Sequence, residues 1–135
     1  MDPYGLARDD LPIVLEWYRT NYPDVTRGLE SRIWPVDNLA ELTGSEGANV
    51  CWSSWCLPII LIDSDLKAGE MAGTVAHECK HQRQSRSDRK KMRRQDDVAT
   101  EAAKKNPKQV PWGPIHQEIY EYGWHYENLY NAPTP

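Results

Sequence analysis

The chain has 135 residues and a formal net charge of −4, with 39 % apolar and 27 % charged residues. A chain of this length builds one modest hydrophobic core, so a single domain over residues 1–135 is expected. This ordinary balance of charge and apolarity argues against a general binder of nucleic acid or of membrane surfaces.

The number of cysteines and the first residues of the chain indicate the cellular compartment in which the protein is expected. Three cysteines, an odd number, fit a reducing environment better than a disulfide framework, although Cys51 and Cys56 could pair if oxidised. Cys79 falls on an apolar helix face and is expected to be buried and inert. The start of the chain lacks a basic and apolar export signal, and no apolar run is long enough to span a membrane. We expect a cytoplasmic protein, or a virion-associated one if a phage encodes it.

Hydrophobic spacing and turn residues predict a small α+β fold. From the N-terminus, the expected elements are a helix over residues 11–22, a strand over 32–36, a turn of helix over 37–44, strands over 49–55 and 57–62, and helices over 67–85, over 96–105 and after residue 114. A small antiparallel or mixed sheet should pack on the helix over 67–85. An acidic second helix and the C-terminal helix should complete a cleft.

A basic run from Arg83 to Arg94 holds seven of the sixteen lysines and arginines. Such a run is typical of a solvated helix end and loop. Binding of an anionic partner such as nucleic acid is the alternative, for which salt-dependent retention on DNA would be the mark.

The motif His77-Glu78-Cys79-Lys80-His81 lies within the helix expected over 67–85. Histidines four residues apart share one face of a helix, so both imidazoles can reach a single metal ion. The apolar stripe of this helix, which includes Val75 and Cys79, lies on nearly the opposite side, whereas core histidines would share it. Glu78 is close enough to act as general base on a water that the metal activates. The motif predicts a zinc-dependent hydrolase; surface histidines or a metal-free descendant are the alternatives.

This motif, preceded by an apolar strand and followed by a helix with acids in its first turns, resembles that of the zincin metallopeptidases over roughly residues 59–105. Gln84 and Ser87 stand where the histidine-rich branch requires Gly and then His or Asp. The chain is more similar to the gluzincin branch, and to small predicted metallopeptidases of bacteria and phages.

The resemblance implies hydrolysis of peptide bonds and an acidic third zinc ligand on the next helix, with a second acid one turn away. Asp97 and Glu101 are such a pair. Glu101 is the favoured ligand because its side chain is longer and it leaves more chain for the turn, whereas the family's order of acids favours Asp97. The other acid would hydrogen-bond a ligating histidine. The remaining candidates for the third ligand are His116, Glu118 and Asp96.

The substrate would be a peptide or protein bound in extended form beside an edge strand, for which residues 57–62 are nominated. A donor to the developing oxyanion is expected on the C-terminal helix. The candidates are His116, Tyr120, His125 and Tyr126.

A different class of function is a non-catalytic structural or virion assembly protein that keeps the zincin scaffold. Its six Trp and seven Tyr residues would then serve docking to an oligomeric or assembly partner.

Overall fold

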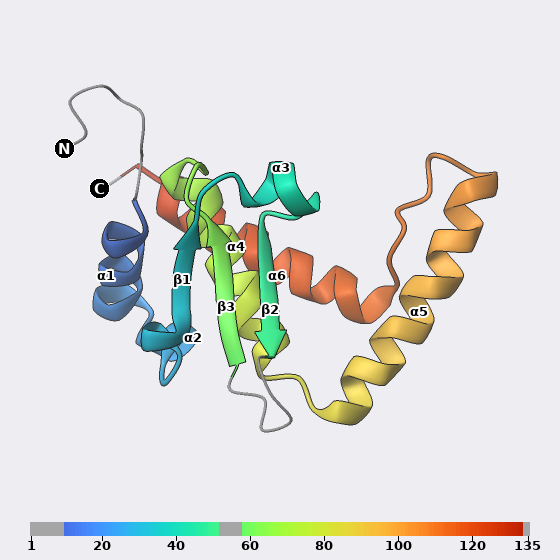
Figure 1. Ribbon diagram of the computed structural model, residues 1–135, viewed down its shortest axis with the longest axis horizontal. Coiled ribbons are helices and arrows are strands. Elements are labelled where there is room, and N and C mark those ends of the chain that lie inside the picture. Colours follow the sequence, from blue (N-terminus) through green and yellow to red (C-terminus); the bar gives the residue numbers. More distant parts are fainter. Residues whose placement is uncertain (1–9, 52–57, 134–135) are drawn as a thin grey trace.

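The computed structural model describes residues 10–51 and 58–133, and in these ranges it confirms an α+β fold with a small three-stranded mixed sheet (Figure 1). The elements are α1 (Leu11–Asn21), α2 (Pro23–Thr26), a 3-10 turn (Glu30–Arg32), β1 (Ile33–Val36), α3 (Leu39–Thr43), β2 (Gly47–Cys51), β3 (Pro58–Asp63), α4 (Ala68–Gln82), α5 (Arg86–Lys105) and α6 (Pro114–Asn131). None of these helices is long and apolar enough to cross a membrane.

The sheet has the order β1-β3-β2, with β3 in the centre. β3 runs parallel to β1 and antiparallel to β2, so that Ile60 pairs with both Ile33 and Asn49. The prediction that residues 57–62 form an edge strand is therefore wrong. Their continuous apolar run is typical of a central strand, and Pro58 is tolerated because it stands at the first position, where a missing N–H matters least.

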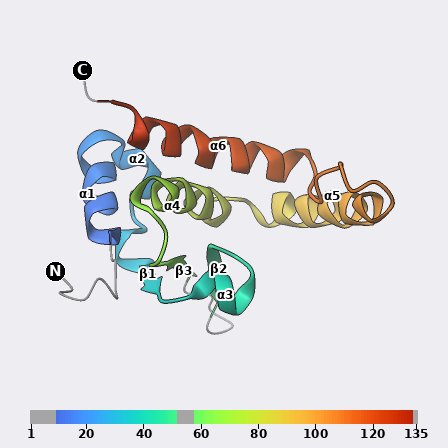
Figure 2. The same cartoon turned by 90° about the horizontal axis from the view of Figure 1, so that it is seen from above.

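Helix α4 lies between the sheet and α6 (Figure 2). Its predicted apolar stripe is confirmed, because Ala72, Val75 and Cys79 are fully buried in one core cluster with Ile60 and Ile62. The opposite side of α4 therefore faces away from this core and remains available for polar side chains. Tyr18 of α1 closes the end of the core, where its hydroxyl donates to the carbonyl oxygen of Ala72.

Only the start of the basic run is a helix end and connection, because Arg83 is the C-cap of α4 and residues 83–85 join α4 to α5. Residues 86–94 form the first half of α5, whose N-cap is Ser85, with its hydroxyl accepting the Asp88 N–H at 3.1 Å. The helix expected over 96–105 is only the second half of the same element. Lysine and arginine are good helix formers, so a run without apolar periodicity still continues the helix. Both views show α5 extending away from the sheet, and Ala99 is its one buried residue (Figures 1 and 2).

Helix α6 begins at Pro114 and returns along α4, as predicted for the last helix. The two helices meet closely at Gly73 and Gly123. A Cβ atom on Gly123 would lie 2.8 Å from the Gly73 carbonyl oxygen and 3.3 Å from the His77 Cβ. Side-chain size sets the distance between packed helices, so this pair of glycines brings α6 down onto the helix that carries the histidine motif.

Of the three cysteines, only Cys79 has a side chain that the structure describes. Cys79 is fully buried, and burial raises the pKa of its thiol to about 12, which confirms the expected buried site. Cys56 lies outside the described residues, so its pairing with Cys51 stays a prediction.

Candidate metal centre

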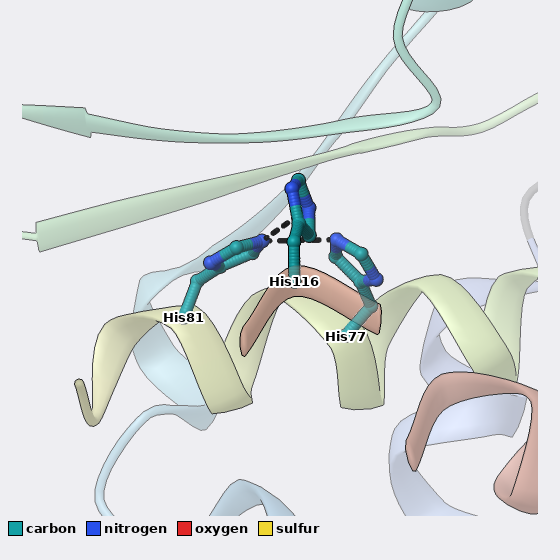
Figure 3. A group of neighbouring side chains, drawn as sticks. All are labelled: His77, His81 and His116. Carbon is teal, nitrogen blue, oxygen red and sulfur yellow. Dashed lines mark hydrogen bonds between the residues drawn. The ribbon is translucent and has the colours of Figure 1, made fainter. Parts of the chain in front are cut away.

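Three histidine side chains from two helices point toward one another (Figure 3). His77 and His81 project from successive turns of α4, and His116 comes from the first turn of α6. The Nε2 atoms of His77 and His81 are 3.0 Å apart, and those of His81 and His116 are 3.3 Å apart. All three ligand atoms lie within 4.8 Å of one another, so this group could hold one metal ion.

These separations can be compared with those of a zinc site. Zinc binds histidine nitrogen at about 2.0–2.1 Å in tetrahedral geometry, which places two ligand nitrogens about 3.3 Å apart. The separations of 3.0 and 3.3 Å are within a few tenths of an ångström of that value. These two pairs therefore need little movement to bind one ion, and the third pair, His77 with His116, lies within 4.8 Å.

The outer nitrogens of two rings are held by neighbouring side chains. The Nδ1 of His81 lies 2.9 Å from Gln84 Oε1, and the Nδ1 of His116 lies 2.9 Å from Asp96 Oδ2. Gln84 points its amide nitrogen at Met92 Sδ, 3.4 Å away, which leaves its carbonyl oxygen for His81. A neutral ring with such a partner on Nδ1 carries its proton there, and its Nε2 is bare.

This choice of tautomer leaves the contact between His81 and His116 without a hydrogen. Two bare Nε2 atoms face each other at 3.3 Å, and their lone pairs repel. A proton between them is opposed by burial, which lowers the pKa of His81. Burial, followed by the neighbouring His81 and His116, likewise lowers the pKa of His77 to about 3. A metal cation would bind the lone pairs of His81 and His116, and His77 offers one ligand atom to the same group, so the donor set fits a metal.

Asp96 also joins the site to the start of α6. While its Oδ2 accepts from His116, its Oδ1 accepts the Gly113 N–H at 2.9 Å, and the adjacent Gln95 Oε1 accepts the Ile115 N–H at 3.1 Å. These bonds satisfy backbone donors that the first turn of a helix leaves open. The second half of α5 thus fixes both the position of α6 and the orientation of its histidine.

Glu78 lies beside the histidines, and only 6 % of it is exposed. Burial raises the pKa of its carboxyl to about 7, and the Asn49 amide, whose nitrogen lies 3.4 Å from Oε2, partly offsets that effect. Strand β2 packs closely against the Glu78 side chain: a Cβ atom on Gly47 would lie 2.8 Å from the Glu78 Cγ. A carboxyl with a pKa near neutrality is suited to proton transfer at physiological pH.

A cleft of about 430 Å³ opens beside His77 and Glu78. Glu46 and Gly47 line it from the side of β2. An aromatic row lines it from the side of α6. The row consists of Trp112, Tyr120 and Trp124.

Tyr120 stands at the centre of this row. Its ring stacks on His116, with centroids 4.7 Å apart and planes 19° apart, and also lies 4.7 Å from the His77 ring. Trp112 and Trp124 pack on either side of it, at 4.3 and 5.7 Å. Burial raises the pKa of the Tyr120 phenol, so the hydroxyl keeps its proton and can donate.

The structure brings together six of the predicted site residues, of which Asp96 contacts His116 Nδ1 and is not one of the three grouped ligand atoms. They are His77, Glu78, His81, Asp96, His116 and Tyr120.

It does not bring Asp97 or Glu101 to the histidines. Both are exposed, and Glu101 binds Lys104 at 2.8 Å instead. The third residue grouped with His77 and His81 is His116, and no acid of α5 takes that place. The physical reason is the phase of α5: Asp96 faces α6, and its neighbour Asp97 is turned about 100° away from it.

Three further candidates also lie away from the site. Glu118 and His125 are exposed. Tyr126 packs on the rings of Tyr18 and Tyr22 at 5.8 and 5.3 Å, so it belongs to the core.

Sequence reasoning missed the supporting residues Gln84, Asn49 and Trp112. Of these, only Gln84 carried a local signal, because a residue three positions after His81 on a helical turn can reach its ring. Asn49 and Trp112 reach the site through tertiary packing, which sequence spacing does not record.

Comparison of the chain with protein-family models, with curated proteins and with solved structures found no match. What the site can do therefore follows from its own side chains.

Proposed function

We propose that this protein is a zinc-dependent peptidase of the zincin type, with His77, His81 and His116 as metal ligands and Glu78 as general base. The observation that carries the proposal is the convergence of the His77, His81 and His116 ligand atoms within 4.8 Å of one another, beside a buried carboxyl and an open cleft. The third ligand is then a histidine on α6, and the acidic ligand of the gluzincin pattern is not part of the set.

Three neutral imidazoles form a donor set typical of catalytic zinc, which keeps one coordination position open. Zinc bound there would polarise a substrate carbonyl and lower the pKa of water toward about 7. Because the rings are already oriented by Gln84 and Asp96, the chain holds its nitrogens near the geometry that binding requires.

Glu78 is placed to move the proton. Its carboxylate accepts a proton from the attacking water and passes it to the leaving amine. Asn49 donates to this carboxylate and also to the Glu78 carbonyl oxygen at 3.2 Å, which holds the end of the side chain toward β2. The pKa near 7 means that the carboxyl exchanges protons readily around neutral pH.

The substrate would lie along β2, which is the sheet edge beside the cleft. Within residues 10–51 and 58–133, strand β2 pairs only with β3, so its other edge would offer backbone donors and acceptors to an extended peptide. The Tyr120 hydroxyl is the candidate donor to the developing oxyanion. His116 loses that role, because its Nε2 serves the metal.

Metal analysis and peptide turnover test the proposal together. Protein purified without chelator should contain one zinc per chain and cleave members of a peptide library. His116→Ala should lose zinc and turnover, whereas His125→Ala, which changes an exposed histidine on the same helix, should keep both. Full zinc content in the His77→Ala, His81→Ala double variant would place the metal elsewhere and refute the site.

A non-catalytic assembly role is the second candidate. It is favoured by the aromatic row, because Trp124 remains 47 % exposed at its end. Zinc binding without turnover of any peptide, together with self-association that Trp124→Ala abolishes, would support this role over catalysis.

A further inference from the structure

The first half of α5 concentrates positive charge on an acidic protein. Residues 86–94 contain six basic residues and one acid, a net charge of +5, so the other residues together carry −9. The composition of the whole chain conceals this separation.

Helix stability does not explain the charge. The N-terminal end of a helix favours acids, and misplaced charges there cost about 0.3–1 kcal/mol. Like charges four residues apart, such as Arg86 with Lys90 and Lys90 with Arg94, cost roughly 0.2–0.5 kcal/mol per pair. Because the helix forms in spite of these terms, the basic residues point to a role outside the helix.

The fold uses only two arginines of the basic run. Arg83 donates to the carbonyl oxygens of Val25 and Arg27, and Arg89 donates to those of His81 and Gln82 at 3.3 and 3.2 Å, where it caps the end of α4. The other five are exposed and form no ion pair within the described part of the chain. They are Arg86, Lys90, Lys91, Arg93 and Arg94.

Four of these five share one side of the helix. At 100° per residue, Arg86, Lys90, Arg93 and Arg94 fall within an arc of about 100° and span about 12 Å along the axis. We call these four residues the basic stripe. It lies on the helix that extends away from the sheet in both views (Figures 1 and 2).

We propose that the basic stripe binds the phosphate backbone of double-stranded DNA. A rigid row of cations matches a regular row of phosphates, and an α-helix fits the width of a major groove. Single strands are bound by stacking on aromatic rings, and α5 contains none. A membrane would require an apolar face, which α5 also lacks, since Met92 and Val98 are its only large apolar residues.

The second half of α5 limits the contact. Asp97 and Glu101 continue on the same side of the helix as the basic stripe and would repel phosphates. The contact is therefore confined to residues 86–94 and is carried by charge, independent of base sequence.

Fluorescence anisotropy of a short labelled DNA duplex, titrated with the full-length protein at several salt concentrations, tests the proposal. Four phosphate contacts predict a slope of log K against log salt near −3.6, which is about a 150-fold loss of affinity from 50 to 200 mM salt. The variant Arg86→Gln, Lys90→Gln, Arg93→Gln, Arg94→Gln should lose binding while circular dichroism shows an intact helix, because glutamine is also a good helix former. Lys104→Gln, Lys105→Gln removes two charges from the same helix outside the stripe and should bind as the wild type does.

Three results would overturn the inference: no binding at 50 mM salt, an unchanged slope in the quadruple variant, or binding to anionic phosphatidylserine vesicles as tight as binding to the duplex. The His77→Ala variant separates this inference from the proposed function. It should bind DNA with wild-type affinity, because the stripe does not use the metal site.

Discussion

Replacement of Glu78 by glutamine should change how stability depends on pH in the metal-free protein. The carboxyl has a pKa of about 7 in the folded protein against 4.5 as its ordinary value, mainly because burial disfavours its charged form. A raised carboxyl pKa means that the folded state binds the proton more tightly than the unfolded state. The contribution of Glu78 to stability is therefore largest below pH 4.5 and is lost as the pH rises through 7.

The size of this loss follows from the shift. Each pKa unit corresponds to about 1.4 kcal/mol, so ionisation of Glu78 should lower the free energy of unfolding by about 3 kcal/mol between pH 4.5 and pH 8. Glutamine keeps the shape and does not ionise, so Glu78→Gln escapes this loss. The difference in free energy of unfolding between variant and wild type should grow by about that amount.

Urea unfolding of chelator-treated wild type and Glu78→Gln at pH values from 4.5 to 8.5 measures the difference. The lowered pKa of His77 makes both proteins lose stability as the pH falls. The lowered pKa of His77 arises from burial and from His81 and His116, not from Glu78, so its effect on stability is the same in both proteins and cancels in their difference. A difference that stays constant over the whole range would show that Glu78 is not held in a desolvated site.

Three further variants probe the geometry of the centre. Asp96→Asn should weaken zinc binding roughly 10- to 100-fold, measured by competition with a chromogenic chelator, while Asp97→Asn leaves it unchanged; equal effects would remove Asp96 from the support of His116. Gly123→Ala should force α6 away from Gly73 and lower both thermal stability and zinc affinity, and unchanged zinc affinity would show that the close helix contact does not set the ligand distance. Tyr120→Phe should keep zinc and KM but lower kcat about 10²- to 10³-fold; a wild-type kcat would assign the oxyanion to another donor.

The sequence predicted those parts of the site that depend on short-range periodicity. Histidines four residues apart, with Val75 and Cys79 on the opposite side of the same helix, required only that the helix form. The third ligand depended on packing. His116 is 35 residues from His81. Its position follows from the length of α5, from the hydrogen bond that joins Asp96 of α5 to Gly113 before α6, and from the contact between Gly73 and Gly123.

Other errors have the same origin. The order of strands depends on which neighbours β3 finds in the folded chain, and the spacing of residues along the sequence does not record those neighbours. Asp97 and Glu101 share a helical face, as their spacing required. In the folded chain α5 is rotated so that this face is exposed to solvent, and Asp96 is the acid that contacts His116. Local propensity fixed the elements, and tertiary contacts chose which of their faces meet.

An ion held jointly by His81 and His116 would also act as a cross-link. It would close a loop of 35 residues that contains the whole of α5. By the chain-entropy relation used for disulfides, a loop of this length disfavours the unfolded state by about 4 kcal/mol. Loss of the ion would free α6 to detach from α4 and would expose the tyrosines that it contributes to the core, among them Tyr126 and Tyr130. The resistance of the protein to proteolysis would then increase with the concentration of available metal.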